Sequence, residues 1–238
     1  MAYPSNGENH HKAIKSEKNL FNYKSDLEKI WGKKIELIEQ IGGTKTKIDN
    51  IISFSDGTNK FLSLKSKKNI KTGSFDYVNT SSFDWSKFFP NTLSIYNNFK
   101  NSKNELNYKK LNQSISDELY DISSELITNL FIDNVINKYK DLILVIINEK
   151  TKSIYCDIIP PAFSLINNGG CLRIKKSEVS KVQTSYIIEG VNSIGDVIDI
   201  GLRIRVHLNN GKSMWLGNKP GTSNLVIKFQ QDSVHKII

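Results

Sequence analysis

The sequence predicts one mixed α/β domain of the α+β class, with an antiparallel, β-rich C-terminal part. The chain has 238 residues, 38% of them hydrophobic and 24% charged, which is enough apolar material for a folded core. Apolar residues recur at helical spacing in residues 12–31 and 115–139, whereas short apolar or alternating segments typical of strands follow from residue 142 onward.

The N-terminal part predicts a tail, a helix and a β-hairpin. Residues 1–11 are polar and lack an apolar signal core, so we expect a flexible tail. Gly42 and Gly43 separate the helix at 12–31 from the hairpin. The hairpin consists of a strand at 47–54, a turn at 55–59 and a strand at 60–66, and its turn is rich in Asp, Gly and Asn.

The remaining elements follow from the same periodicities. Pro90 is expected to break a partly helical, aromatic-rich segment, and Pro160 and Pro161 are expected to end a strand. In chain order we expect a surface loop at 67–82, the partly helical segment at 83–99, a polar connection at 100–113, a long helix at 115–139 and strands at 142–147, 150–158, 171–175, 184–189, 202–208 and 225–230. Because no repeat and no clear linker divides the chain, residues 12–238 are expected to form a single domain.

Charge and cysteine content narrow the function classes. Lys and Arg total 33 against 24 Asp and Glu, a net charge of +9, which favours a polyanionic partner, nucleic acid first and an anionic membrane second. No segment is apolar enough to span a bilayer, and no helix is clearly basic on one face, so we expect no membrane partner. The two cysteines, Cys156 and Cys171, form no disulfide framework, which predicts a reducing, cytoplasmic location.

The predicted hairpin brings a carboxylate and a lysine together. With a five-residue turn, Asp49 lies opposite Lys65, and alternation places Ser63 on the same face. The opposite face is apolar and should pack on the core; its residues are Ile48, Ile52, Phe54, Leu62 and Leu64. A carboxylate beside a lysine suits metal-assisted phosphodiester hydrolysis, because Mg²⁺ binds carboxylate and phosphate oxygens and activates water. An ordinary surface salt bridge across a hairpin fits the same pattern.

Two short motifs resemble a known nuclease core. Lys47-Ile48-Asp49, followed by Phe61-Leu62-Ser63-Leu64-Lys65, is similar to the Lys-x-Asp … Ile-Ser-Leu-Lys form of the PD-(D/E)xK superfamily, which recurs in small Type II restriction endonucleases. The resemblance covers about the first quarter of the chain. It implies a restriction-endonuclease-like mixed central sheet flanked by helices, a catalytic core at about 12–160, and a β-rich DNA-contacting part at about 170–238.

The resemblance also implies an activity and a set of site residues. The activity is Mg²⁺-dependent, sequence-specific cleavage of double-stranded DNA, with Asp49 as metal ligand and Lys65 as the residue that orients or activates water. The family's second acid falls at position 63, where this chain has Ser63, a poor ligand for Mg²⁺. Some relatives recover the carboxylate from an early helix, so Glu17 is the expected second catalytic and metal-binding residue. A solvated helix residue is the other interpretation of Glu17.

Candidate DNA contacts lie in two places. Lys47 begins the first hairpin strand, and Lys67 and Lys68 follow the second, where phosphate contacts are needed. In the C-terminal part the residues expected to contact DNA are Arg203, Arg205, Lys212 and Lys219. Arg is the preferred reader of guanine edges, and in the resembled enzymes an apolar-Lys-apolar-Gln segment such as 227–230 follows an Arg-bearing strand. Ordinary solvated loop and sheet residues would give the same pattern.

Three functions therefore stay open. A Type II restriction endonuclease leads, and a structure-specific repair nuclease shares its core. A non-catalytic DNA-binding protein that has lost the second acid belongs to another class. For a restriction enzyme, a homodimer and a monomer are both open, and a companion DNA methyltransferase encoded nearby is a further expected partner.

Overall fold

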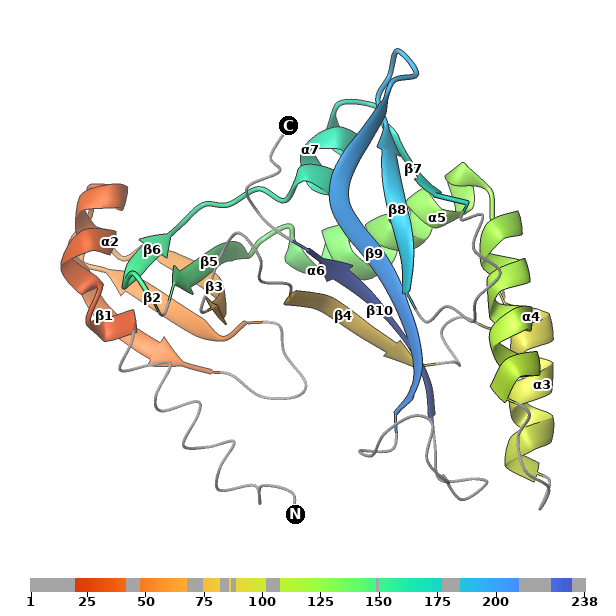
Figure 1. The fold of residues 1–238 in the computed structure, drawn as a ribbon. Helices are drawn as coiled ribbons and strands as arrows, with labels where there is room; N and C mark the ends of the chain where they lie inside the picture. Colours follow the sequence, from red (N-terminus) through yellow and green to blue (C-terminus); the bar gives the residue numbers. More distant parts are fainter. Residues whose placement is uncertain are drawn as a thin grey trace. The chain divides into compact units, whose positions relative to one another are not determined.

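The structure, a computed structural model, describes residues 20–41, 48–67, 75–81, 86, 89–101, 108–148, 150–176, 185–209 and 224–232. The chain divides into two compact units, Met1–Gly73 with Asn137–Ile159, and Ser74–Ile136 with Pro160–Ile238. Each unit contains one five-stranded sheet together with helices, so the predicted α+β class is confirmed (Figure 1). Among the described residues, no helix has the length and apolar character needed to cross a membrane.

The first unit is built on a mixed sheet. Its strand order is β1-β2-β3-β5-β6, and only the β3–β5 pair is parallel. The strands are β1 (Ile35–Gln40), β2 (Asn50–Phe54), β3 (Asn59–Lys67), β5 (Ile143–Asn148) and β6 (Ser153–Tyr155). The helices of this unit are α2 (Lys24–Trp31) and the short α6 (Asn137–Tyr139). Strand β3 is therefore central, with neighbours on both sides.

The apolar face expected for the hairpin is confirmed by the core of this unit. Ile52, Phe54 and Leu62 are buried in one cluster with Leu27 of α2, and Leu64 packs against that cluster. The β-branched and aromatic side chains of β2 alternate with less buried ones, as a half-buried strand requires. Packing of α2 on this face leaves the other face of the hairpin to carry polar residues.

The register of the hairpin differs from the prediction by two residues. Asn50 pairs with Leu62 and Ile52 with Lys60, so Asp49 does not lie directly opposite Lys65. The turn is tighter than expected, because the amide of Phe54 already donates to the carbonyl of Thr58. Since the shift is an even number of residues, it keeps each β3 side chain on its predicted face.

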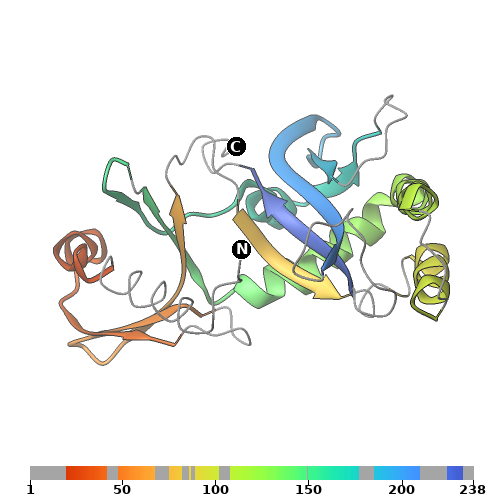
Figure 2. The ribbon, with the colours of Figure 1, turned by 60° about the horizontal axis from the view of Figure 1, so that its bottom comes forward.

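The second unit contains an antiparallel sheet in the order β4-β10-β9-β8-β7. The strands are β4 (Phe75–Ser81), β7 (Cys171–Ile174), β8 (Ser185–Val191), β9 (Val197–Asn209) and β10 (Asn224–Gln231). The helical segments are α3 (Pro90–Asn101), α4 (Tyr108–Asp121), α5 (Ser124–Phe131), a π-helical turn (Ile132–Ile136) and α7 (Pro161–Asn167). Helices α5 and α7 lie against the sheet (Figures 1 and 2). Phe131 stacks edge-on against Phe163 and Phe229 in the core between them.

Several elements differ from the sequence-based expectation. Strand β4 replaces part of the loop expected at 67–82, strand β1 was not expected, and α4 begins at Tyr108, within the connection expected at 100–113. The long helix expected at 115–139 is interrupted, because Ser123 is extended and its hydroxyl caps α5 by accepting from the amide of Leu126. Pro90 and Pro161 each begin a helix, a position that suits proline because it lacks an amide donor.

Candidate active site

Asp49 lies where the β2–β3 ladder becomes irregular. Its amide donates to the carbonyl of Leu62 at 2.8 Å, although Leu62 is already the register partner of Asn50. Its carbonyl accepts from Ile41 at 3.1 Å, on the opposite side. Two residues of one strand facing one residue of the other is the arrangement of a β-bulge, a feature that re-aims a side chain and often adjoins active sites. The regular alternation of faces therefore ends at Asp49.

Before β2 begins, the carboxylate of Asp49 accepts the hydrogen bonds from β3 that the backbone of a longer β2 would accept. Its Oδ2 accepts from the amide of Leu64 at 2.7 Å and from the hydroxyl of Ser63 at 3.4 Å. Both bonds use the same oxygen. Within the described part of the chain, Oδ1 accepts no hydrogen bond. A carboxylate that is fixed through one oxygen and open at the other fits the coordination habits of Mg²⁺, which takes oxygen ligands singly from one or two carboxylates.

Ser63 and Lys65 follow each other on the same face of the central strand. Ser63 is fully buried, so its hydroxyl orients Asp49 rather than meeting solvent. Lys65 is half-buried and is the register partner of Ile146 in parallel strand β5. No ion pair joins Lys65 to Asp49, both of which lie in the described residues. The salt bridge that the sequence left open is therefore not formed, and the ammonium group stays available to a ligand.

Other expected site residues cannot be placed. Glu17, Lys47, Lys68, Lys212 and Lys219 lie outside the described residues, and for Lys67 the structure describes only the backbone, at the end of β3. Within the described ranges, no group of three or more His, Cys, Asp or Glu side chains could hold a metal ion. Asp49 is thus the part of the expected metal site that the structure places, and the second carboxylate has to come from Glu17 or from another residue.

Lys60, on the same strand as Lys65, has a different environment because it lies on the other face of the sheet. It lies on the apolar face of the hairpin, with its Nζ 5.3 Å from the centre of the Trp31 ring. That geometry is a cation–π contact, which favours a structural role. Lys60 and Lys65 are five residues apart on one strand and consequently face opposite sides of the sheet.

Shifted pKa values lie at other positions. Burial raises the pKa of the Cys156 thiol to about 12, and burial raises the pKa of the Tyr186 hydroxyl to about 12. Hydrogen bonds from Lys33 and Thr58 lower the pKa of the Asp56 carboxyl in the hairpin turn. These shifts accompany packing and turn formation, so they mark structural groups.

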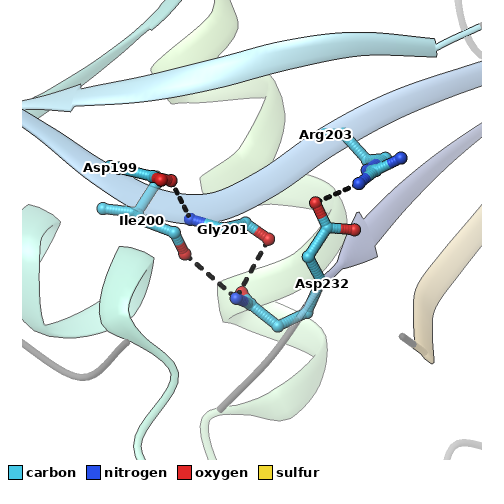
Figure 3. Close-up of polar contacts among 6 residues, drawn as sticks. Asp199, Ile200, Gly201, Arg203 and Asp232 are labelled. Carbon is cyan, nitrogen blue, oxygen red and sulfur yellow. Dashed lines mark hydrogen bonds and ion pairs between the residues drawn. The ribbon is translucent and has the colours of Figure 1, made fainter. Parts of the chain in front are cut away.

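The second candidate region is strand β9. Arg203 forms an ion pair with Asp232, directly after β10 (Figure 3), and Arg205 is exposed. Sequence reasoning did not anticipate Asp232, because an acid 29 residues from its partner gives no local signal. The cross-strand register brings the two together.

Comparisons with models of protein families, with curated proteins and with solved structures find no match to this chain.

Proposed function

We propose that this chain is a Mg²⁺-dependent endonuclease that cleaves double-stranded DNA at specific sequences, in the manner of Type II restriction enzymes. One observation carries the proposal. Asp49 lies at a β-bulge with one carboxylate oxygen fixed and the other open, beside the central strand that carries Lys65. The resemblance of the two motifs to the PD-(D/E)xK core supports it, because there too the acid begins one strand and the lysine lies on the next.

Each residue of the hairpin has a definite task in this proposal. Ser63 and the amide of Leu64 hold Oδ2 of Asp49, so that Oδ1 would be the oxygen that ligates Mg²⁺. Bound Mg²⁺ supplies Lewis-acid stabilisation of the phosphate and lowers the pKa of a water molecule. Lys65 orients that water and offsets the charge that develops at phosphorus. Glu17 supplies the second carboxylate. The products carry a 5′-phosphate and a 3′-hydroxyl, as the family resemblance implies.

The cellular setting belongs to the same proposal. The net charge of +9 suits a polyanionic substrate, and the two free cysteines suit the cytoplasm. A homodimer would bring two such sites to the two strands of the duplex, and a DNA methyltransferase encoded nearby is the expected companion.

A DNA-binding protein without catalytic activity is the second candidate. Ser63 in the place of the family's second acid favours it, as does the single carboxylate that the described residues bring to the site. The two functions differ in one measurable property, which is metal-dependent cleavage.

The test is a cleavage assay with matched controls. Purified protein is incubated with plasmid and phage DNA, with Mg²⁺ or with EDTA, and compared with Asp49→Asn, Lys65→Ala and Glu17→Ala. Asp56→Asn removes a carboxylate at the far end of the same hairpin, and Lys60→Ala removes a lysine from the opposite face of the same strand.

Discrete fragments that need Mg²⁺, that persist in both controls and that vanish in Asp49→Asn and Lys65→Ala are the expected result. Loss of cleavage in Glu17→Ala assigns the second carboxylate to that residue. A wild-type protein that binds these DNAs but cuts none of them refutes the nuclease and leaves the DNA-binding protein.

A further inference from the structure

The sheet of the second unit has one apolar face and one basic face. Along β9, Leu202, Ile204 and Val206 are buried, whereas Arg203 is half-buried and Arg205 is exposed. This strict alternation shows that the apolar residues pack inward and the two arginines lie on the opposite face. The cross-strand register extends that face to both sides of β9.

The register defines the members of the basic face. Lys228 of β10 lies directly opposite Arg205, and Ile187 of β8, 52% exposed, lies directly opposite Arg203. On the outer strand β7, Arg173 lies opposite Glu189, and both Arg173 and Lys175 form ion pairs with that carboxylate. We call the side chains of Arg203, Arg205, Lys228, Arg173 and Lys175 the basic face.

Arg205 is the most accessible cation of the basic face. It is exposed and forms no ion pair within the described residues. Half-buried Lys228 lies directly opposite it, so both side chains lie on the same side of the sheet. A polyanion lying over the face would contact both cations at once, so the arrangement favours a phosphate-rich partner over a neutral one.

Arg203 is held in place by the end of β10 (Figure 3). Its Nη2 is ion-paired with Oδ2 of Asp232, and the side chain is still 37% exposed. The amide of Asp232 donates to the carbonyl of Gly201 at 2.6 Å, which fixes the residue that bears the carboxylate. The neighbouring Gln231 is fully buried, and its amide nitrogen donates to the carbonyls of Ile200 and Gly201.

The backbone at Gly201 is also held by a residue of its own strand, β9. Gly201 has a positive φ of 63°, a conformation that glycine adopts without strain, and its amide donates to Oδ1 of Asp199 at 2.9 Å. Arg203 lies two residues after Gly201. The ion pair with Asp232 preorients the guanidinium, which lowers the side-chain entropy that it loses when it binds a ligand.

We propose that the basic face binds the phosphate backbone of double-stranded DNA, and that Asp232 is a positioning residue that presents Arg203 to the duplex. This inference rests on the proposed function and names the surface that holds its substrate. Arg205 and Lys228 contact phosphate oxygens, and Arg203, with Nη2 held by Asp232, uses its remaining outer nitrogen. The occupant is double-stranded DNA because the proposed function acts on it, and because lysine and arginine contacts to phosphates supply much of the affinity of a protein for a duplex.

The test measures binding without cleavage. A fluorescein-labelled 30-base-pair DNA duplex of mixed sequence is titrated by anisotropy in EDTA over a series of salt concentrations. The variants are the double variant Arg205→Ala/Lys228→Ala and the single variant Arg205→Gln, at an exposed position that folding tolerates. Lys138→Ala removes an exposed lysine of the first unit and serves as the charge-matched control.

The double variant is expected to weaken binding and to reduce the slope of log K against log salt by about 1.8, since each lost phosphate contact reduces it by about 0.9. Arg205→Gln is expected to reduce it by about half of that, and the control by nothing. Slopes that match wild type in both variants, or equal affinity for an RNA duplex of the same sequence, overturn the assignment of this face to DNA.

A double-mutant cycle tests the role of Asp232. If Asp232 positions Arg203, Asp232→Asn weakens binding as Arg203→Ala does, and adds nothing when Arg203 is already absent. If Asp232 only neutralises charge, Asp232→Asn strengthens binding in both backgrounds, and the positioning role is refuted. Cleavage is scored separately with Mg²⁺, so a failed DNA surface leaves the nuclease intact, and a failed nuclease leaves the binding result intact.

Discussion

Replacing Asp49 separates its structural contribution from its proposed metal-binding one. The carboxylate accepts a hydrogen bond from the amide of Leu64 at 2.7 Å, and hydrogen bonds to charged groups contribute roughly 1.5–3 kcal/mol. Asp49→Ala removes that acceptor and leaves the amide of half-buried Leu64 without its partner, so we expect a loss of about 2 kcal/mol in the free energy of unfolding. Asp49→Asn keeps a neutral oxygen at the same place, so we expect a loss of about 1 kcal/mol or less.

The two variants should therefore differ in stability and agree in activity. Urea unfolding followed by circular dichroism gives the free energies, provided that the slope of the transition stays constant across the series. Cleavage with Mg²⁺ should be abolished in both, because an amide oxygen is a poor substitute for an anionic ligand. Asp49→Asn that still cuts DNA with Mg²⁺ refutes the metal-binding role, and Asp49→Asn as unstable as Asp49→Ala refutes the hydrogen-bond account.

Three further predictions concern the framework. The pKa of Asp56 is lowered by Lys33, so its contribution is fully present above the unfolded value of about 3.9 and lost as pH falls; the melting-temperature difference between wild type and Asp56→Asn should shrink below that pH. Phe131→Ala should cost about 3–5 kcal/mol in urea unfolding, because it empties a fully buried aromatic site. In Cys171→Ser, alkylation of the remaining Cys156 at pH 8 should be much slower in the native than in the urea-unfolded protein, because burial raises its pKa to about 12.

The hairpin was predictable because its signals are local. Alternation fixes the face of each β3 residue, and the turn composition fixes its position to within two residues. The error of two residues came from the turn, where Thr58 already pairs with Phe54 and Gly57 takes a positive φ of 81°. An odd error would have put Lys65 on the core face and the buried Leu62 on the opposite face. Because the apolar face is buried, a shift by an odd number of residues is excluded. Ser63 and Lys65 therefore share one face as predicted, although the predicted cross-strand pairs were wrong.

Elements that depend on distant partners were not predictable. Strand β4 is polar in composition and becomes a strand because it pairs with β10, about 150 residues later in the chain. The bulge at Asp49 has the same origin, since it requires Leu62 to accept from a residue already outside the ladder. The ion pair of Arg203 with Asp232 is likewise set by the register of β9 with β10. The pattern of a single sequence indicates helix and strand propensity and hydrophobic periodicity, but it does not indicate which distant strands pair.

The hydrogen bonds of Asp49 explain an oxygen acceptor at this position, but they do not explain a charge. An asparagine could also accept from the amide of Leu64 and would avoid the desolvation of a half-buried carboxylate. No ion pair with a described Lys or Arg compensates that charge, and Lys65 in particular is not paired with it. A cation that joins the site on function, with Oδ1 as its ligand, gives the negative charge a physical reason. The same reasoning applies in reverse to exposed Arg205, where a phosphate of the DNA that we propose would compensate the positive charge. Asp49 and Arg205 are therefore the positions at which the metal and the DNA that we propose would compensate a charge that no ion pair within the described residues compensates.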